Sequence, residues 1–158
     1  MIQLFRKVIL LVTLLSAGCV QTQPLLIDEP IGPSHHSATR SGHGALVVYS
    51  ETRPFSGDPD YLIHTGYTLL TPQGALIQLV DNHSGIQRRE PTEVTLPVGR
   101  YSVLARDARY GTIRLIAIIE PGRTTVIDLN GELLSEPDKE SDRWVRLPTG
   151  RIIGLRSE

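Results

Sequence analysis

Apolar and polar residues alternate in short runs along most of the chain. In the run 92–96, Val94 and Leu96 fall on one side of an extended chain, opposite Glu93 and Thr95. A period of two predicts a strand with one buried face. About seven strands are predicted in this way, and they cover residues 45–51, 61–70, 75–80, 92–96, 100–108, 112–120 and 124–129. No stretch after the N-terminal segment has a convincing helical period, so the pattern predicts an all-β protein.

Turn residues separate the predicted strands. "TPQG" (71–74), "PVG" (97–99) and "PGR" (121–123) combine the fixed φ of Pro with the freedom of Gly to take positive φ. Short strands joined by such turns favour a β-sandwich, in which two sheets each bury one face. We place this domain at residues 44–131 and interpret residues 51–60 as a long loop within it.

The end of the chain carries a further β pattern. "WVRL" (144–147) and "RIIGL" (151–155) flank "PTG", which predicts a hairpin. The hairpin either extends a sheet edge or packs Trp144 on the sandwich as a core or covering residue. The charged run 135–142 is interpreted as a solvated loop, so we expect residues 132–158 to form a loop and a C-terminal hairpin.

The N-terminal segment has the three parts of an export signal. Arg6 and Lys7 form the positive part, residues 8–17 form the apolar part, and the small residues 16–18 follow. This run of ten residues is too short for a membrane-spanning helix, which needs roughly 20. We therefore expect residues 1–18 to be a signal peptide that is removed.

The only cysteine of the chain, Cys19, stands directly after this segment. "LSAGC" (15–19) resembles the lipobox of bacterial lipoproteins. The resemblance implies that the Cys19 thiol carries a diacylglyceryl group and that the mature chain begins there, anchored in the cell envelope. Val20 follows the cysteine in place of Asp, which by the same resemblance implies the outer membrane where the cell has two membranes. The alternatives are a plain secretory signal with an incidental cysteine and a short anchor that is not cleaved.

Residues 19–43 have the composition of a spacer. They hold three prolines with Ser, Thr and Gly, and they show no sustained period. Such a segment buries too little apolar surface to order itself. We expect a lipidated flexible tether between the membrane and the domain.

The overall charge is close to neutral. The chain has 16 basic and 17 acidic residues, and removal of residues 1–18 takes away Arg6 and Lys7 and no acid. The mature chain then carries a formal charge of −3, which predicts no nucleic-acid partner. Such a chain is not drawn to an anionic membrane as a whole, so the lipid is expected to hold it there.

A longer motif lies in residues 92–131. It has the form LPxGxYxVxAxxxxYG, then a strand, then xxxPGxTTxxxLxG. The matching residues are Leu96, Pro97, Gly99, Tyr101, Val103, Ala105, Tyr110, Gly111, Pro121, Gly122, Thr124, Thr125, Leu129 and Gly131. The run resembles carboxypeptidase-regulatory-like and transthyretin-like domains of bacterial envelope proteins. The resemblance implies an Ig-like/transthyretin-like β-sandwich that acts as an accessory module beside many activities.

Five histidines raise the question of a metal site. His35, His36 and His43 lie in the predicted tether, whereas His64 and His83 lie in or beside predicted strands. No HxH or HExxH spacing joins them to an acid. We interpret the tether histidines as solvated and His64 as half-exposed or hydrogen-bonded.

Two carboxylates form a second candidate metal site. Asp58 and Asp60 lie two residues apart in a Gly/Pro loop. Calcium needs six or more oxygen ligands, to which Asp81 and Asn82 would contribute if their loops converged. Asx-type turns explain these residues more simply.

Catalytic patterns are weak throughout. Ser84 stands beside His83, but adjacency in sequence does not create the geometry of a base and a nucleophile. No GxSxG motif occurs, and Arg88 and Arg89 are interpreted as a solvated basic patch. We expect no enzymatic activity and no cofactor.

These patterns together predict a membrane-anchored cell-envelope lipoprotein. The domain is expected to act as a non-enzymatic binding or structural module, attached to the membrane through lipid on Cys19 and bound to an unidentified envelope protein or glycan. The alternative hypothesis is a metal-dependent enzyme or metal-binding sensor that uses His64, His83 and the Asp58/Asp60 loop.

Overall fold

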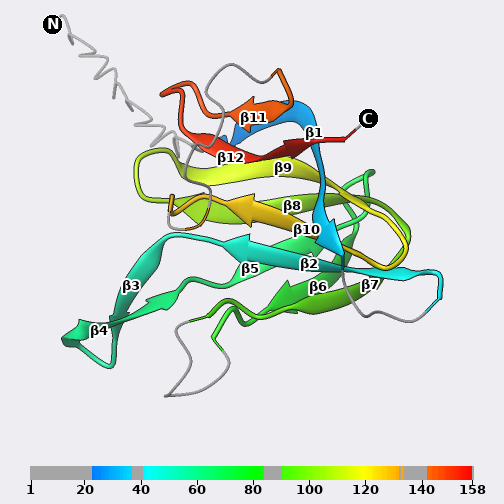
Figure 1. Cartoon of the computed structure of the whole chain (residues 1–158). Helices are drawn as coiled ribbons and strands as arrows, with labels where there is room; N and C mark the ends of the chain where they lie inside the picture. Colours follow the sequence, from blue (N-terminus) through cyan, green and yellow to red (C-terminus); the bar gives the residue numbers. More distant parts are fainter. Residues whose placement is uncertain (1–22, 37–40, 84–89, 132, 134–141, 158) are drawn as a thin grey trace, which may run out of the picture.

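The computed structural model describes residues 23–36, 41–83, 90–131, 133 and 142–157, and within these ranges the protein is all-β (Figure 1). The strands are β1 (Leu25–His36), β2 (His43–Tyr49), β3 (Thr52–Phe55), β4 (Asp58–His64), β5 (Tyr67–Leu70), β6 (Leu76–Val80), β7 (Val94–Pro97), β8 (Gly99–Asp107), β9 (Gly111–Ile119), β10 (Arg123–Asp128), β11 (Trp144–Arg146) and β12 (Ile152–Arg156). The prediction of an all-β chain is confirmed.

Two layers of strands share β1. The first layer, called sheet A, has the order β6-β5-β8-β9-β1-β12-β11, and the second, called sheet B, has the order β1-β10-β2-β7. Residues 25–31 of β1 run parallel to β9, whereas residues 33–36 pair antiparallel with β10. The strand therefore passes from one layer to the other and joins them along one side (Figure 1). Strands β3 and β4 form a separate two-stranded sheet.

The core lies between the two layers, as the alternation predicts. In β8 and β9, Val103 and Leu115 point inward and are buried, whereas Arg106 and Thr112 point outward. Leu46 and Ile127 of sheet B belong to the same buried cluster. Each layer therefore contributes one apolar face, which is the arrangement of a β-sandwich.

The prediction of a flexible tether is wrong for residues 25–36, which form β1. Ile31 in this strand is fully buried and belongs to the core. The strand was missed because its register shifts twice, between Leu26 and Pro30 and again between Pro33 and His35. These irregularities remove the period of two and also accommodate the prolines, which cannot donate to a ladder.

The loop predicted at 51–60 is also corrected, because this segment contains β3, the whole turn to β4 and the first residues of β4. Ser56 and Gly57 both have positive φ, 50° and 80°, as a two-residue hairpin turn of type I′ requires. The strand predicted at 61–70 is in fact two strands, β4 and β5, separated at Thr65 and Gly66.

The C-terminal hairpin forms as predicted and extends sheet A. Val145 of β11 pairs with Gly154 of β12, and β12 in turn pairs with β1. Gly150 closes the turn by donating its N–H to the carbonyl of Leu147 over 2.8 Å, with φ of 87°. The hairpin is thus part of the same layer as β8 and β9.

Candidate functional site

A buried polar cluster lies where β2 ends and β4 ends. The Asn82 amide nitrogen donates to the Val48 carbonyl over 2.7 Å and to the Ser50 hydroxyl over 3.2 Å. The Ser50 hydroxyl in turn donates to the Thr65 carbonyl over 2.6 Å. His64 Nδ1 lies 2.7 Å from the Ser50 carbonyl oxygen. These contacts join the chain at the ends of β2, β4 and β6, so the polar groups have a structural role.

Asn82, a candidate calcium ligand in the sequence, has this structural role. Its side-chain oxygen accepts the Thr92 N–H over 2.9 Å, and the Thr92 hydroxyl donates to the Asp81 carbonyl over 2.9 Å. The amide therefore anchors the chain before β7 to the end of β6.

His64 and His83 line one shallow hollow beside the β3–β4 hairpin, together with Asp81. The ring of His83 packs on Phe55 with ring centroids 4.8 Å apart. Asp58 does not line this hollow, and its Oδ1 accepts the Asp60 N–H over 2.9 Å in an Asx turn. Within the described ranges, no three His, Cys, Asp or Glu side chains come together in a way that could hold a metal ion.

The remaining histidines lie in strands, not in a tether. His35 and His36 are exposed at the end of β1, opposite Thr124 and Arg123 of β10. His43 begins β2, and its Nδ1 lies 3.3 Å from the Ser41 carbonyl oxygen.

Several candidates from the sequence fall outside the described residues. They are Cys19, Ser84, Arg88 and Arg89.

Two buried aspartates that the sequence analysis did not single out each close a turn. Asp107 Oδ1 accepts the N–H groups of Arg109 and Tyr110 over 2.8 and 2.9 Å. Asp128 accepts the Gly131 N–H over 2.6 Å in the same way. An Asp at the end of a strand, followed within four residues by Gly, is the signal that would have identified both as turn residues.

Tyr101 closes the turn between β7 and β8. Its hydroxyl donates to the Pro97 carbonyl over 2.8 Å, and its ring packs against the core. Burial raises the pKa of the Tyr101 hydroxyl. The "LPxGxY" motif therefore has a physical reason here, because the tyrosine fastens the turn that precedes its own strand.

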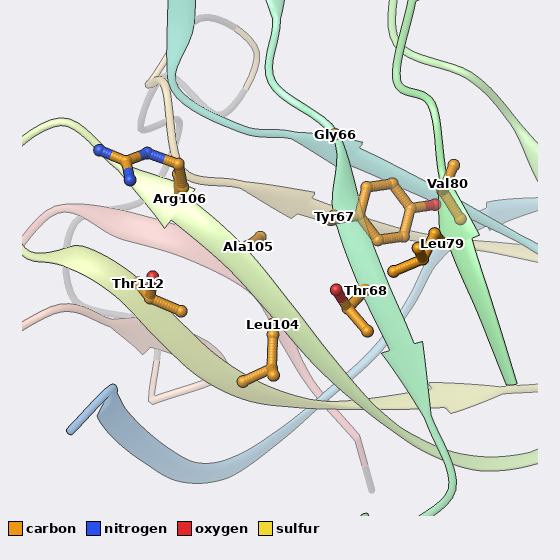
Figure 2. Close-up of a pocket in the computed structure, with 9 residues that line it drawn as sticks. All are labelled: Gly66, Tyr67, Thr68, Leu79, Val80, Leu104, Ala105, Arg106 and Thr112. Atoms are coloured by element: carbon orange, nitrogen blue, oxygen red, sulfur yellow. The ribbon is translucent and has the colours of Figure 1, made fainter. Parts of the chain in front are cut away.

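The outer face of sheet A, which points away from the core, carries many apolar side chains. One row of cross-strand neighbours consists of Leu79, Thr68, Leu104, Arg114 and Leu26. The next row consists of Leu76, Leu70, Ser102, Ile116 and Pro30. Figure 2 shows part of this face, with Thr68, Leu79 and Leu104 around a shallow hollow.

Strand β6 forms one edge of this sheet, and its outer side has no neighbouring strand in the described structure. Leu76 and Leu79 are 62% and 71% exposed, and Ile77 between them is 44% exposed. Natural edge strands usually carry charges or prolines that discourage pairing with other chains, but β6 has neither. An apolar edge without such protection can accept an additional strand.

No protein family, curated protein or solved structure matches this chain. The described residues include no helix of a length and apolarity that could cross a membrane.

Proposed function

We propose that this chain is a lipid-anchored binding module of the cell envelope, without enzymatic activity. The "LSAGC" segment supports the anchor, with a diacylglyceryl group on Cys19 and residues 1–18 removed. Val20 supports an outer-membrane location in cells with two membranes. The turn made by Pro97 and Tyr101 supports the resemblance to carboxypeptidase-regulatory-like sandwiches, although such a fold accompanies many functions.

The observation that carries the binding role is the exposed apolar edge at β6. A partner polypeptide in an extended conformation would pair with the free N–H and C=O groups of this strand, and its side chains would contact Leu76 and Leu79. The side chains of Asn82, Ser50 and His64 are engaged in internal hydrogen bonds, so the edge is a better candidate than this polar cluster. An envelope protein is the partner class that fits strand pairing.

Two experiments test the proposal in intact cells. Cys19→Ser should abolish labelling by radioactive fatty acid and release the protein from membranes. Labelling that persists in this variant would refute the anchor.

For the edge, a photo-crosslinking residue at Gln78 should give a discrete product that the same group at Val98, an exposed position in the β7–β8 turn, does not give. Introducing Leu79→Lys should remove the product, because a charge on the edge opposes strand pairing. Identical products from both positions would contradict a role for β6.

A further inference from the structure

The connection between the domain and Cys19 is much shorter than the tether predicted from the sequence. Strand β1 begins at Leu25, so only residues 20–24 separate it from the predicted lipid attachment site. A chain spans at most about 3.6 Å per residue, which limits the distance from Cys19 to Leu25 to roughly 20 Å in any conformation. A tether extending to residue 43 would have allowed about four times that distance. One surface of an anchored domain must therefore lie close to the membrane.

The position of Leu26 indicates which surface this is. Leu26 is 53% exposed and pairs with Arg114 of β9 on the outer face of sheet A. It lines a shallow hollow on that face together with Arg100, Arg114 and Ile116. The short connection thus enters the domain beside the outer face of sheet A.

The charge of this face differs from that of the whole mature chain. The outward positions of β5, β6, β8 and β9 include Arg100, Arg106 and Arg114, and no Asp or Glu. In β1, Asp28 and Glu29 are exposed near Leu26, and Glu29 is neutralised by its ion pair with Arg156 over 2.9 Å. Arg106 pairs with Glu51 over 2.8 Å, whereas no described carboxylate pairs with Arg100 or Arg114. Beside these arginines Leu26 is exposed, and Leu104 and Ile116 are half-buried. Such a mixture of apolar and cationic side chains is typical of surfaces that bind at a membrane interface.

We propose that the outer face of sheet A lies flat on the membrane that holds the lipid of Cys19. Leu26, Leu104 and Ile116 then contact the boundary between headgroups and acyl chains, while Arg100 and Arg114 contact anionic headgroups. This inference rests on the proposed lipid anchor. It leaves the edge of β6 pointing along the membrane plane, where a partner strand can still pair with it.

The test uses the full-length, acylated lipoprotein in vesicles of phosphatidylethanolamine and phosphatidylglycerol that contain a nitroxide-labelled lipid. An environment-sensitive fluorophore is attached at Leu104→Cys or Ile116→Cys, with Leu62→Cys, an exposed leucine on the separate β4 strand, as the matched control. We expect quenching by the nitroxide lipid to be at least about twofold stronger at 104 and 116 than at 62. Unchanged circular dichroism and melting temperature verify that each labelled variant is folded.

Reversal of charge on this face provides a second test of the proposal. Arg100→Glu combined with Arg114→Glu should reduce the quenching at position 104, because the face then repels phosphatidylglycerol. Equal, weak quenching at 62, 104 and 116 would overturn the proposal. A blue-shifted fluorophore at 104 that the nitroxide lipid does not quench would also overturn it, since a protein or a second copy would then cover the face.

The two proposals fail in distinguishable ways. A protein that lacks the acyl group and does not float with the vesicles refutes the lipid anchor. A protein that is acylated and floats, but shows no quenching difference, refutes the membrane-facing surface and leaves the anchor intact.

Discussion

The carboxylate of Asp107 forms an ion pair with the guanidinium of Arg151, which joins the β8–β9 turn to the C-terminal hairpin. The Asp107 side chain is fully buried, whereas that of Arg151 is 34% exposed. The two residues are 44 positions apart in sequence. The pair therefore fastens the last strands of sheet A to a turn at the end of its central strands.

Removal of Arg151 should destabilise the fold more than loss of an ordinary surface ion pair. In Arg151→Met the buried carboxylate keeps its two backbone N–H donors but loses its cation, and we expect a loss of about 1–3 kcal/mol. Arg156→Met is the control, because its pair with Glu29 is exposed and should be worth less than about 1 kcal/mol. Urea denaturation measures the free energy of unfolding of both variants. Equal effects would show that the Asp107 pair has no special role.

Substitutions that remove buried atoms from β1 should lower the free energy of unfolding, because this strand is part of the core. Ile31→Ala removes a fully buried side chain, and we expect a loss of about 2–4 kcal/mol. Leu26→Ala, at an exposed position of the same strand, should change stability by less than about 0.5 kcal/mol. Melting and urea curves test this pair, and a neutral Ile31→Ala would restore the interpretation of residues 25–36 as a tether.

The sequence predicted strands well where one regular face is buried. Strand β9 was placed within one residue at each end, because Ile113, Leu115 and Ala117 alternate without interruption toward the core. Strand β1 was not found, since register shifts occur near both Pro30 and Pro33 and erase the alternation.

The candidate surfaces depend on partners far away in sequence, which local patterns do not reveal. The run around Leu79 was predicted as a strand, but its place at a sheet edge follows from pairing with β5 and from the absence of a described neighbour on its other side. The ion pair of Asp107 likewise needs Arg151, which only the folded chain brings near. Spacing within a segment cannot identify either feature.

Metal ions should not stabilise the protein if the polar cluster is structural. His64 Nδ1 lies against the Ser50 carbonyl oxygen, and the Asn82 oxygen accepts the Thr92 N–H, so a metal would have to displace existing contacts. We expect Zn²⁺ or Ca²⁺ to shift the melting temperature by less than about 1 °C. A saturable rise that disappears in His64→Ala or His83→Ala would instead favour the metal-binding alternative.

Breaking the hydrogen-bond network around Asn82 should lower the free energy of unfolding. Asn82→Ala leaves the Thr92 N–H and the Val48 carbonyl without their side-chain partner, and we expect a loss of about 2–3 kcal/mol without any metal present. Thr92→Val removes only the hydroxyl contact to the Asp81 carbonyl and should cost about 1 kcal/mol or less. Hydrogen exchange at the β2 and β7 amides would locate the loosened region, and similar losses in both variants would argue against a central role for Asn82.

Two tyrosines should make the fold sensitive to alkali. Burial strongly raises the pKa of Tyr67 above its ordinary value, and burial also raises the pKa of Tyr101. Above about pH 10 the unfolded chain loses the phenolic protons while the folded chain retains them, so stability is full below that pH and falls as pH rises through the folded pKa values.

The Tyr67 hydroxyl is buried without a hydrogen-bond partner among the described residues, so Tyr67→Phe should preserve or raise stability at neutral pH, by up to about 1 kcal/mol. Tyr101→Phe loses the bond to Pro97 and should cost about 1 kcal/mol at neutral pH. Melting temperatures measured from about pH 8 to about pH 11 should fall less steeply in Tyr67→Phe than in the parent chain. Parallel curves for the two proteins would mean that Tyr67 ionises equally in the folded and unfolded states, and that its ring lies in a more solvated position than the core between the two layers.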